Sequence, residues 1–174
     1  MSNTLNNNID FKLKPLSKDA IPAALEKATR YRLLNEPGEA ESVCLDVLSA
    51  EPDNQNALVT LLLALTDRFA KGYGIGDRRA EQILPRLRNE YDRAYYAGIV
   101  EERRAKARLH QGTPGASFTA FEELRDAMSH YEKAEALRSP GNDDVLLRWN
   151  ACVRLIKNNR LEARSEEALE PYLE

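Results

Sequence analysis

Apolar and small residues recur every three to four positions in seven stretches of this chain, and short polar segments separate the stretches. Such a repeat places the apolar side chains on one face of an α-helix. No stretch alternates apolar and polar residues as a half-buried strand would. The pattern therefore predicts an all-α protein with helices over 21–34, 39–50, 57–70, 78–88, 90–111, 120–137 and 143–157.

The segments between these stretches contain residues that end helices. A proline or a glycine lies within each of 35–38, 51–54, 112–115 and 139–142. Residues 57–70 are apolar almost all round, which predicts a helix that its neighbours cover on several sides. Pro85 lies inside 78–88 and should kink that helix or leave an unpaired carbonyl near Glu81, because proline has no backbone N–H.

The helical pattern occupies only the middle of the chain. Residues 1–17 are polar and asparagine-rich, and Pro15 opposes an early helix, so we expect a flexible tail. Residues 18–159 contain all the periodic stretches and form the predicted helical-repeat domain. Residues 160–174 are acidic and predict a short last helix that caps the domain.

Five residues between 21 and 54 match a known repeat without any gap: Ala28, Tyr31, Ala40, Val47 and Pro52. This segment resembles the tetratricopeptide repeat (TPR), a helix-turn-helix unit of about 34 residues. Small residues at 28 and 40 would let two antiparallel helices approach closely, and Tyr31 would fill the remaining gap. Pro52 would stop the second helix before the next repeat.

Two later segments resemble the same repeat more loosely. Ala80 follows Ala40 by 40 residues and Ala127 follows Ala80 by 47 residues, and both intervals exceed the period. Tyr131 and Ala134 also match the third unit. The resemblance implies stacked antiparallel helical hairpins that form a short TPR-like solenoid of about three to four units. A generic stack of helical hairpins stays open as the alternative.

Members of this family bind partners on the concave face of the solenoid, which the first helix of each unit lines. The resemblance therefore implies a protein-protein interaction adaptor or scaffold that binds a partner protein or peptide. The matching groove candidates are Leu25, Thr29, Arg32, Asn56, Val59, Leu63, Thr66, Tyr95, Ile99, Glu102 and Arg154. The Lys and Asn side chains with which the best-known members hold a peptide carboxylate are replaced here by Leu25, Thr29 and Thr60. A groove rich in Leu, Val and Tyr suggests an apolar or amphipathic segment instead, either from a partner or from the chain's own terminal helix.

The most unusual charged stretch is 101–108. On a helix, Glu102 and Lys106 form a favourable (i, i+4) pair, whereas Arg104 and Arg108 share a face and repel each other. A solvated, salt-bridged face is the simpler interpretation. The alternative is a small-molecule or anion-binding site in the groove. Its candidate residues are Glu102, Arg103, Lys106, Arg148 and Arg154.

The acidic last helix suggests a third function, self-assembly into a homo-oligomer. Its apolar residues Leu169, Tyr172 and Leu173 would dock on the open end of a neighbouring copy. Repeat stacks need a polar cap at each end, and an exchanged helix would provide one.

Composition and charge argue against several other classes. A net charge of −3 argues against general nucleic-acid binding, because proteins that bind nucleic acids usually have a basic domain. Cys44 and Cys152 lie far apart in helical stretches and predict two buried thiols, without a disulfide or a zinc site. The longest apolar run, 57–65, is too short to span a bilayer, and the N-terminus has no secretory signal. We therefore expect a cytoplasmic protein with no membrane partner.

Neither catalysis nor a cofactor is expected. The glycines within 71–77 lack the Gly-Lys-Ser/Thr ending of a phosphate loop and predict an inter-helix loop. His110 and His130 have no Cys or carboxylate at ligand spacing, so no metal site is predicted. No nucleophile stands beside a plausible base in the sequence, so the chain is not expected to be an enzyme.

Overall fold

The structure, a computed structural model, describes residues 11–71 and 78–164, and within these ranges all regular secondary structure is helical. Seven α-helices follow one another there: α1 (Ile21–Leu33), α2 (Pro37–Ala50), α3 (Gln55–Asp67), α4 (Arg79–Ile83), α5 (Glu90–Gln111), α6 (Ala116–Leu137) and α7 (Asp144–Asn159). The prediction of an all-α protein is confirmed for these residues. The first ten residues of the predicted tail and the loop predicted around 72–77 lie outside the described ranges.

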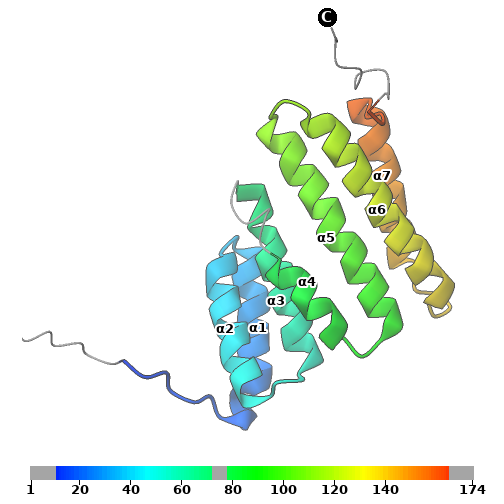
Figure 1. The fold of residues 1–174 in the computed structure, drawn as a ribbon. Coiled ribbons are helices and arrows are strands. Elements are labelled where there is room, and N and C mark those ends of the chain that lie inside the picture. Colours follow the sequence, from blue (N-terminus) through cyan, green and yellow to red (C-terminus); the bar gives the residue numbers. More distant parts are fainter. Residues whose placement is uncertain (1–10, 72–77, 165–174) are drawn as a thin grey trace, which may run out of the picture.

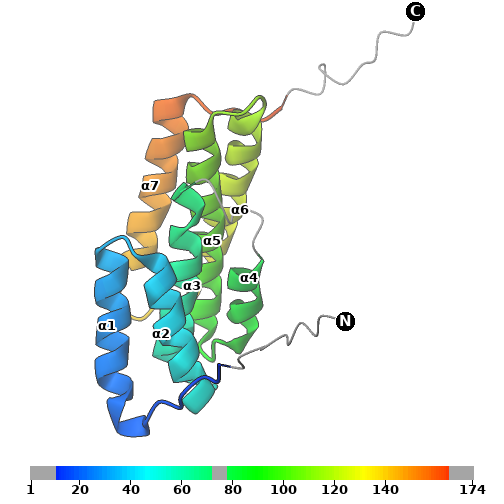
Figure 2. The same cartoon turned by 90° about the vertical axis from the view of Figure 1, so that its left-hand side faces the viewer.

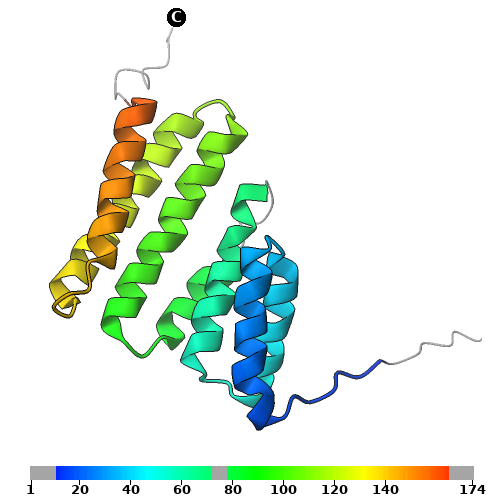
Figure 3. The same ribbon diagram turned by 180° about the vertical axis from the view of Figure 1, so that it is seen from behind.

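The helices lie in two layers. Figure 1 shows α2, α4 and α6 toward the viewer, and Figure 3, seen from behind, shows α1, α3, α5 and α7 in front. Figure 2 gives the same order from the side, with α1 and α7 at one edge and α4 and α6 at the other. Helices that follow each other in the sequence run antiparallel and pack together, so the chain passes back and forth between the two layers.

Polar and glycine residues fix where the helices begin and end. The Asn54 side chain accepts a hydrogen bond from Ala57 N at 2.9 Å, and Asn89 accepts one from Tyr91 N at 2.8 Å. These bonds satisfy backbone donors that the first turns of α3 and α5 leave without a helical partner. Helix α5 ends at Gly112, whose φ of +62° is a left-handed conformation that glycine adopts without strain.

The segment 78–88 is not the single kinked helix that the sequence predicts. Helix α4 stops at Ile83, and Leu84–Arg86 form a 3-10 turn around Pro85. Proline donates no backbone hydrogen bond and its ring crowds the preceding turn, so the α-helix ends before it. The apolar residues Ile83 and Leu87 on either side of the turn still pack into one core.

A first core lies among α1 to α4 and one side of α5. Helix α3 contributes Leu58, Leu61, Leu62 and Leu65, each at most 6% exposed. The same core takes Phe69, which follows α3 directly. The prediction of a central helix that its neighbours cover on several sides is therefore confirmed.

A second core lies between α5, α6 and α7. Its buried residues include Ala105 on α5, Leu124 and Tyr131 on α6, and Val145 and Cys152 on α7. Helix α5 thus separates the two cores and contributes to both.

The helix predicted from residue 160 onward is wrong where the structure describes it. Helix α7 ends at Asn159, Arg160 adopts a φ of +50°, and the chain from there to residue 164 is not helical. The Leu161 N–H donates to Ile156 O at 3.0 Å, a bond that closes the last turn of α7. Leu161 then turns into the second core, where it is 6% exposed. The rest of the predicted helix, 165–174, lies outside the described residues.

Gly98 allows α6 to pack closely against α5. A Cβ at this position would lie 2.3 Å from Cε1 of the buried Tyr131 ring. We expect Gly98→Ala to lower the free energy of unfolding by about 1–3 kcal/mol in urea titrations, because the ring or the helix must move. Gly38→Ala is the matched control, since its Cβ would meet nothing within 4 Å. Equal stability of the two variants would contradict the close approach.

The two thiols give a pH dependence. Cys44 and Cys152 are free and fully buried, and burial raises their pKa from 9.0 to about 11 and about 12. The neutral thiols therefore stabilise the fold fully below the unfolded pKa, and this contribution is lost as the pH rises through the folded values. Between neutral pH and a pH close to 11 we expect the wild type to lose more free energy of unfolding than the Cys44→Ala, Cys152→Ala double variant. Equal losses, measured by urea unfolding at both pH values, would show that the thiols do not titrate in this way.

Candidate functional site

A groove crosses the layer of α1, α3 and α5, and we call it the α1–α3–α5 groove. Its volume is about 1090 Å³. Apolar side chains from all three helices line it, namely Ile21, Leu25, Leu33, Val59 and Tyr96. These helices run side by side in the layer that faces the viewer in Figure 3. The shape of the groove therefore depends on how these three helices pack side by side.

Charged residues also line this groove, and acidic ones are in the majority. Glu26, Glu51 and Asp92 stand against Lys18 and Arg30. Among the described residues, neither Glu26 nor Asp92 forms an ion pair. Burial raises the pKa of Asp92 above its usual value, because a half-buried carboxylate loses hydration that no nearby cation replaces. A cation on a bound molecule would relieve this cost.

A smaller pocket of about 300 Å³ continues the same face toward the C-terminal end of α1. Leu33 and Thr29 line both cavities, so the two are neighbours. We call the smaller one the arginine pocket. Its charged lining residues are Arg32, Asp67, Arg103 and Lys106.

Asp67 joins three helices at the arginine pocket. Arg32 of α1 donates two hydrogen bonds to its carboxylate, at 2.7 and 3.3 Å. Arg103 of α5 lies 2.8 Å from Asp67 Oδ1 and also donates to Thr66 Oγ1 at 2.6 Å and to Leu63 O at 3.0 Å. Burial lowers the pKa of Arg103 and Asp67 opposes that shift. One carboxylate of α3 thus holds a guanidinium from α1 and another from α5.

Glu102 is 1% exposed, and groups from three helices hold its carboxylate. Tyr131 of α6 donates to Oε2 at 2.6 Å. Lys106 of α5 forms an ion pair with Oε1, as the (i, i+4) spacing predicts, and Arg148 of α7 lies 3.5 Å from the same oxygen. Burial and the neighbouring Glu102 raise the pKa of Tyr131, so its hydroxyl keeps the proton that it donates. Both oxygens of Glu102 are engaged, and the cluster ties α5 to α6 and α7 as a structural network.

The other arginines of 101–108 have separate acidic partners. Arg104 lies 2.6 Å from Glu81 of α4 and 3.0 Å from Glu101. Arg108 donates to Glu123 of α6 at 2.5 Å. These ion pairs offset the repulsion predicted between the two arginines. They provide the salt bridges of the simpler interpretation, but the face is not solvated, because the Arg104 side chain is 12% exposed and Glu102 is buried.

The residues predicted to line a binding groove fall into three groups. The first group lines the α1–α3–α5 groove: Leu25, Thr29, Asn56 and Val59. The second lines the arginine pocket: Arg32, Thr66, Arg103 and Lys106. The third lines neither cavity: Leu63, Tyr95, Ile99, Glu102, Arg148 and Arg154.

The third group is mostly engaged elsewhere. Ile99 is 2% exposed, and Tyr95 packs against the second core with its ring 6.1 Å from that of Tyr131. Leu63 packs on the first core. Arg154 is exposed on α7. Packing against the two cores thus holds Leu63 and Tyr95 away from both cavities, and Ile99 is buried. Within this group, only Arg154 lies fully on the surface.

Sequence reasoning missed Asp92 and Tyr96, which α5 contributes to the groove. The candidate Tyr95 lies one residue before Tyr96, and Glu102 lies one residue before Arg103, which lines the arginine pocket. One residue turns a helical side chain by about 100°. The resemblance to the repeat is loosest before α5, so it did not fix the rotation of this helix. A heptad plot of α5 that placed Asp92, Tyr96 and Arg103 on one face would have found them.

The ranges 11–71 and 78–164 contain neither a metal-ligand cluster nor a membrane-spanning helix. No group of three or more His, Cys, Asp and Glu side chains gathers there in a way that would hold a metal ion. No helix there combines the length and the apolar character needed to cross a membrane. His110 is exposed and His130 half-buried.

Tyr131→Phe tests the network around Glu102. Removing the hydroxyl leaves Glu102 Oε2 buried without its donor, so we expect the free energy of unfolding to fall by about 1–3 kcal/mol. Tyr31→Phe is the matched control on α1, because the Tyr31 hydroxyl bonds to no described residue. Its change should stay within about 0.5 kcal/mol. Urea unfolding of both variants measures the difference, and similar losses would show that the Tyr131 hydroxyl does not stabilise the fold.

Comparison with known proteins adds no relative to this description. No family model matches the chain, and searches among curated proteins and among solved structures give no match either. The function must therefore be inferred from the α1–α3–α5 groove, the arginine pocket and the contacts that shape them.

Proposed function

We propose that this chain is a protein-protein interaction adaptor that binds a segment of a partner protein in the α1–α3–α5 groove. The observation that carries the proposal is the groove itself, about 1090 Å³ in volume and lined by apolar residues from three helices. Apolar side chains such as Leu25, Val59 and Tyr96, presented by rigid helices, suit an extended or helical segment with apolar anchors. Such a segment would bury these side chains without any rearrangement of the helices.

We further propose that the stack is TPR-like. The antiparallel pairs α1–α2, α3–α4 and α5–α6 follow one another in the same two layers (Figures 1 and 3). Ala28 and Ala40 are fully buried where the resemblance expects small residues. Tyr131, which matches the tyrosine position of the third unit, is also fully buried. These features support a repeat architecture whose first helices present the binding face.

The arginine pocket adds charge to this face. Arg32, Arg103 and Lys106 outnumber Asp67 in its lining. Since ion pairs already engage both guanidiniums, an acidic group of the partner would gain a modest contact there. Contacts of this kind set the orientation and the rate of binding more than the affinity. The partner segment we propose therefore has apolar anchors and an acidic residue at the end that meets this pocket.

A small-molecule or anion-binding function receives less support. Asp67 neutralises part of the charge on Arg32 and Arg103, and Glu102 holds Lys106 and Arg148. An anion would have to compete with these carboxylates for the same donors. The groove, in contrast, offers apolar surface that no described side chain covers.

We place the adaptor in the cytoplasm. Both cysteines are free and buried, which suits a reducing compartment.

The proposal is tested by Leu33→Glu. Leu33 is 83% exposed and lines both cavities, so the change adds a charge to the binding face without disturbing a core. We expect the partner captured from a native lysate to bind at least about tenfold more weakly to this variant. Leu45→Glu is the control, since Leu45 is 51% exposed on α2 in the other layer.

Mass spectrometry identifies the captured protein, and chemical cross-linking shows whether it contacts α1 and α3. Circular dichroism checks that both variants stay folded. A partner that binds Leu33→Glu as well as it binds the wild type, or one that cross-links only to α2 and α6, would overturn the proposal.

A further inference from the structure

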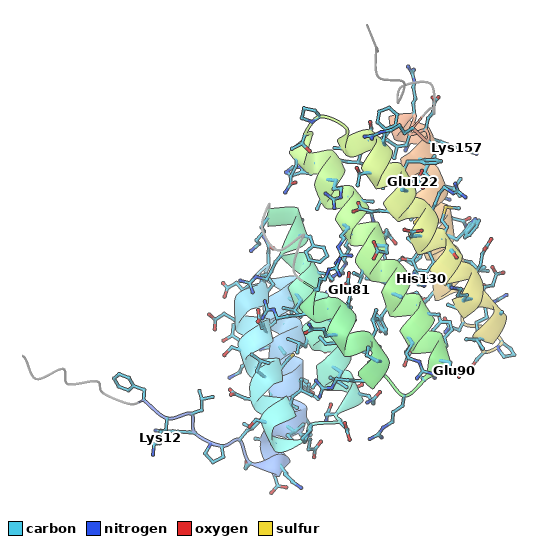
Figure 4. All side chains as sticks on the ribbon, viewed as in Figure 1. Lys12, Glu81, Glu90, Glu122, His130 and Lys157 are labelled. Atoms are coloured by element: carbon cyan, nitrogen blue, oxygen red, sulfur yellow. The ribbon has the colours of Figure 1, made fainter. Side chains whose placement is uncertain are left out.

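Residues 11–17 form an arm without regular secondary structure that precedes the first helical turn. Figure 4 shows Lys12 on this arm, far from the helices. Phe11 is 87% exposed and Leu13 is 91% exposed. Lys12 and Lys14 alternate with them, so an extended backbone places the two apolar side chains on one side and the two lysines on the other. Two large apolar side chains almost fully in water indicate a contact surface that is unfilled in the single chain.

The arm does not lie in its own groove. Leu16 anchors its root, where it packs against the small core of Ile21, Val47 and Ala57. From this anchor the described part of the arm leads away from the helices (Figures 1 and 3), and in Figure 2 it points away from the edge formed by α1 and α7. The α1–α3–α5 groove opens on the layer of α1 and α3, so the arm and the groove of one molecule face different directions.

We propose that this arm binds in the α1–α3–α5 groove of a second copy of the chain. Phe11 and Leu13 would contact the apolar lining that Leu25, Val59 and Tyr96 form. Lys12 and Lys14 would reach the carboxylates of Glu26 and Asp92, which lack ion pairs among the described residues. This occupancy goes beyond the adaptor function, although it uses the same groove.

The charge of the lining residues favours the α1–α3–α5 groove over the arginine pocket as the site for the arm. The groove lining contains three acidic residues and two basic ones, whereas the arginine pocket has three basic residues and one acidic one. The two lysines of the arm are attracted by the first set and repelled by the second. The half-buried Asp92 gains most from a lysine, because its carboxylate is partly desolvated and has no cation beside it.

The contact joins two different surfaces of the chain. Copies that exchange arms reciprocally form a closed, isologous dimer, and copies that donate in one direction form a heterologous open chain. Either arrangement raises the mass in solution above the 19.7 kDa of the monomer. The mass should rise with protein concentration, and salt should weaken the association by screening the lysine contacts.

Two measurements test the arm directly. A labelled synthetic peptide of residues 11–17 is titrated with the full chain and its fluorescence anisotropy is followed. Sedimentation velocity of the full chain over a range of concentrations gives the mass. We expect saturable peptide binding, and a loss of about tenfold or more in affinity when Phe11 and Leu13 of the peptide are both changed to Ser.

A charge swap makes the test specific. Glu26→Lys with Asp92→Lys in the full chain should weaken binding of the wild-type peptide, and a peptide with Lys12→Glu and Lys14→Glu should regain affinity for that variant. Glu122→Lys is the control, because Glu122 is exposed on α6 in the other layer (Figure 4). No rescue, or an equal loss in the control, would overturn the proposed contact.

Failure of this inference is separable from failure of the adaptor proposal. A chain that stays monomeric and does not bind the peptide, yet loses its captured partner on Leu33→Glu, overturns only the arm contact. A chain that binds the peptide but captures no partner overturns only the adaptor proposal.

Discussion

Helix α5 has to pack on two sides at once, and the other elements are arranged around that constraint. Val100 contributes to the first core and Ala105 to the second, and both are almost fully buried. Gly98 meets this demand because any Cβ there would clash with Tyr131 of α6. The same helix carries Asp92 and Tyr96 into the groove and Arg103 into the arginine pocket. Both cavities therefore arise from the way in which α5 is packed, and a shift of this helix would change the stability and the shape of the two cavities together.

Shared carboxylates hold the helices in place in both layers. Asp67 pairs with Arg32 and Arg103, Glu102 pairs with Lys106 and Arg148, and Glu41 pairs with Arg68 and Arg79. Each carboxylate draws cations from different elements, or from different turns of one helix, into one cluster. Exposed ion pairs stabilise proteins little, but a buried carboxylate with several donors costs much to disrupt. The guanidiniums at the centre of the face are consequently fixed in position, which leaves apolar contact as the main source of affinity for any segment bound there.

The sequence predicts the helices better than the site. The helix predicted over 90–111 matches α5 residue for residue, because a long apolar repeat with an Asn before it and a Gly after it specifies both ends. The sequence did not indicate that Arg160 adopts a left-handed conformation and that Leu161 then turns into the core, since the acidic residues beyond it favour a helix. The ion pairs of Asp67 could not be predicted from the sequence either, because Arg32 lies 35 residues away and no local pattern marks such a pair. Local periodicity determines helices, whereas the groove depends on how helices rotate against one another.

The two occupants proposed for the α1–α3–α5 groove have different charge. The arm of residues 11–17 is basic and matches Glu26 and Asp92, whereas the partner segment carries its acidic residue to the arginine pocket. Both need the apolar lining around Leu25 and Val59, so they exclude each other. Mass action then links assembly to partner binding: a partner that binds only the free groove separates the copies, and a high concentration of the chain raises the apparent Kd of the partner. Since the arm is part of every copy, the proposed contact would let the concentration of the chain itself set how much groove is open, and the exposed Phe11 and Leu13 would be the side chains through which that control acts.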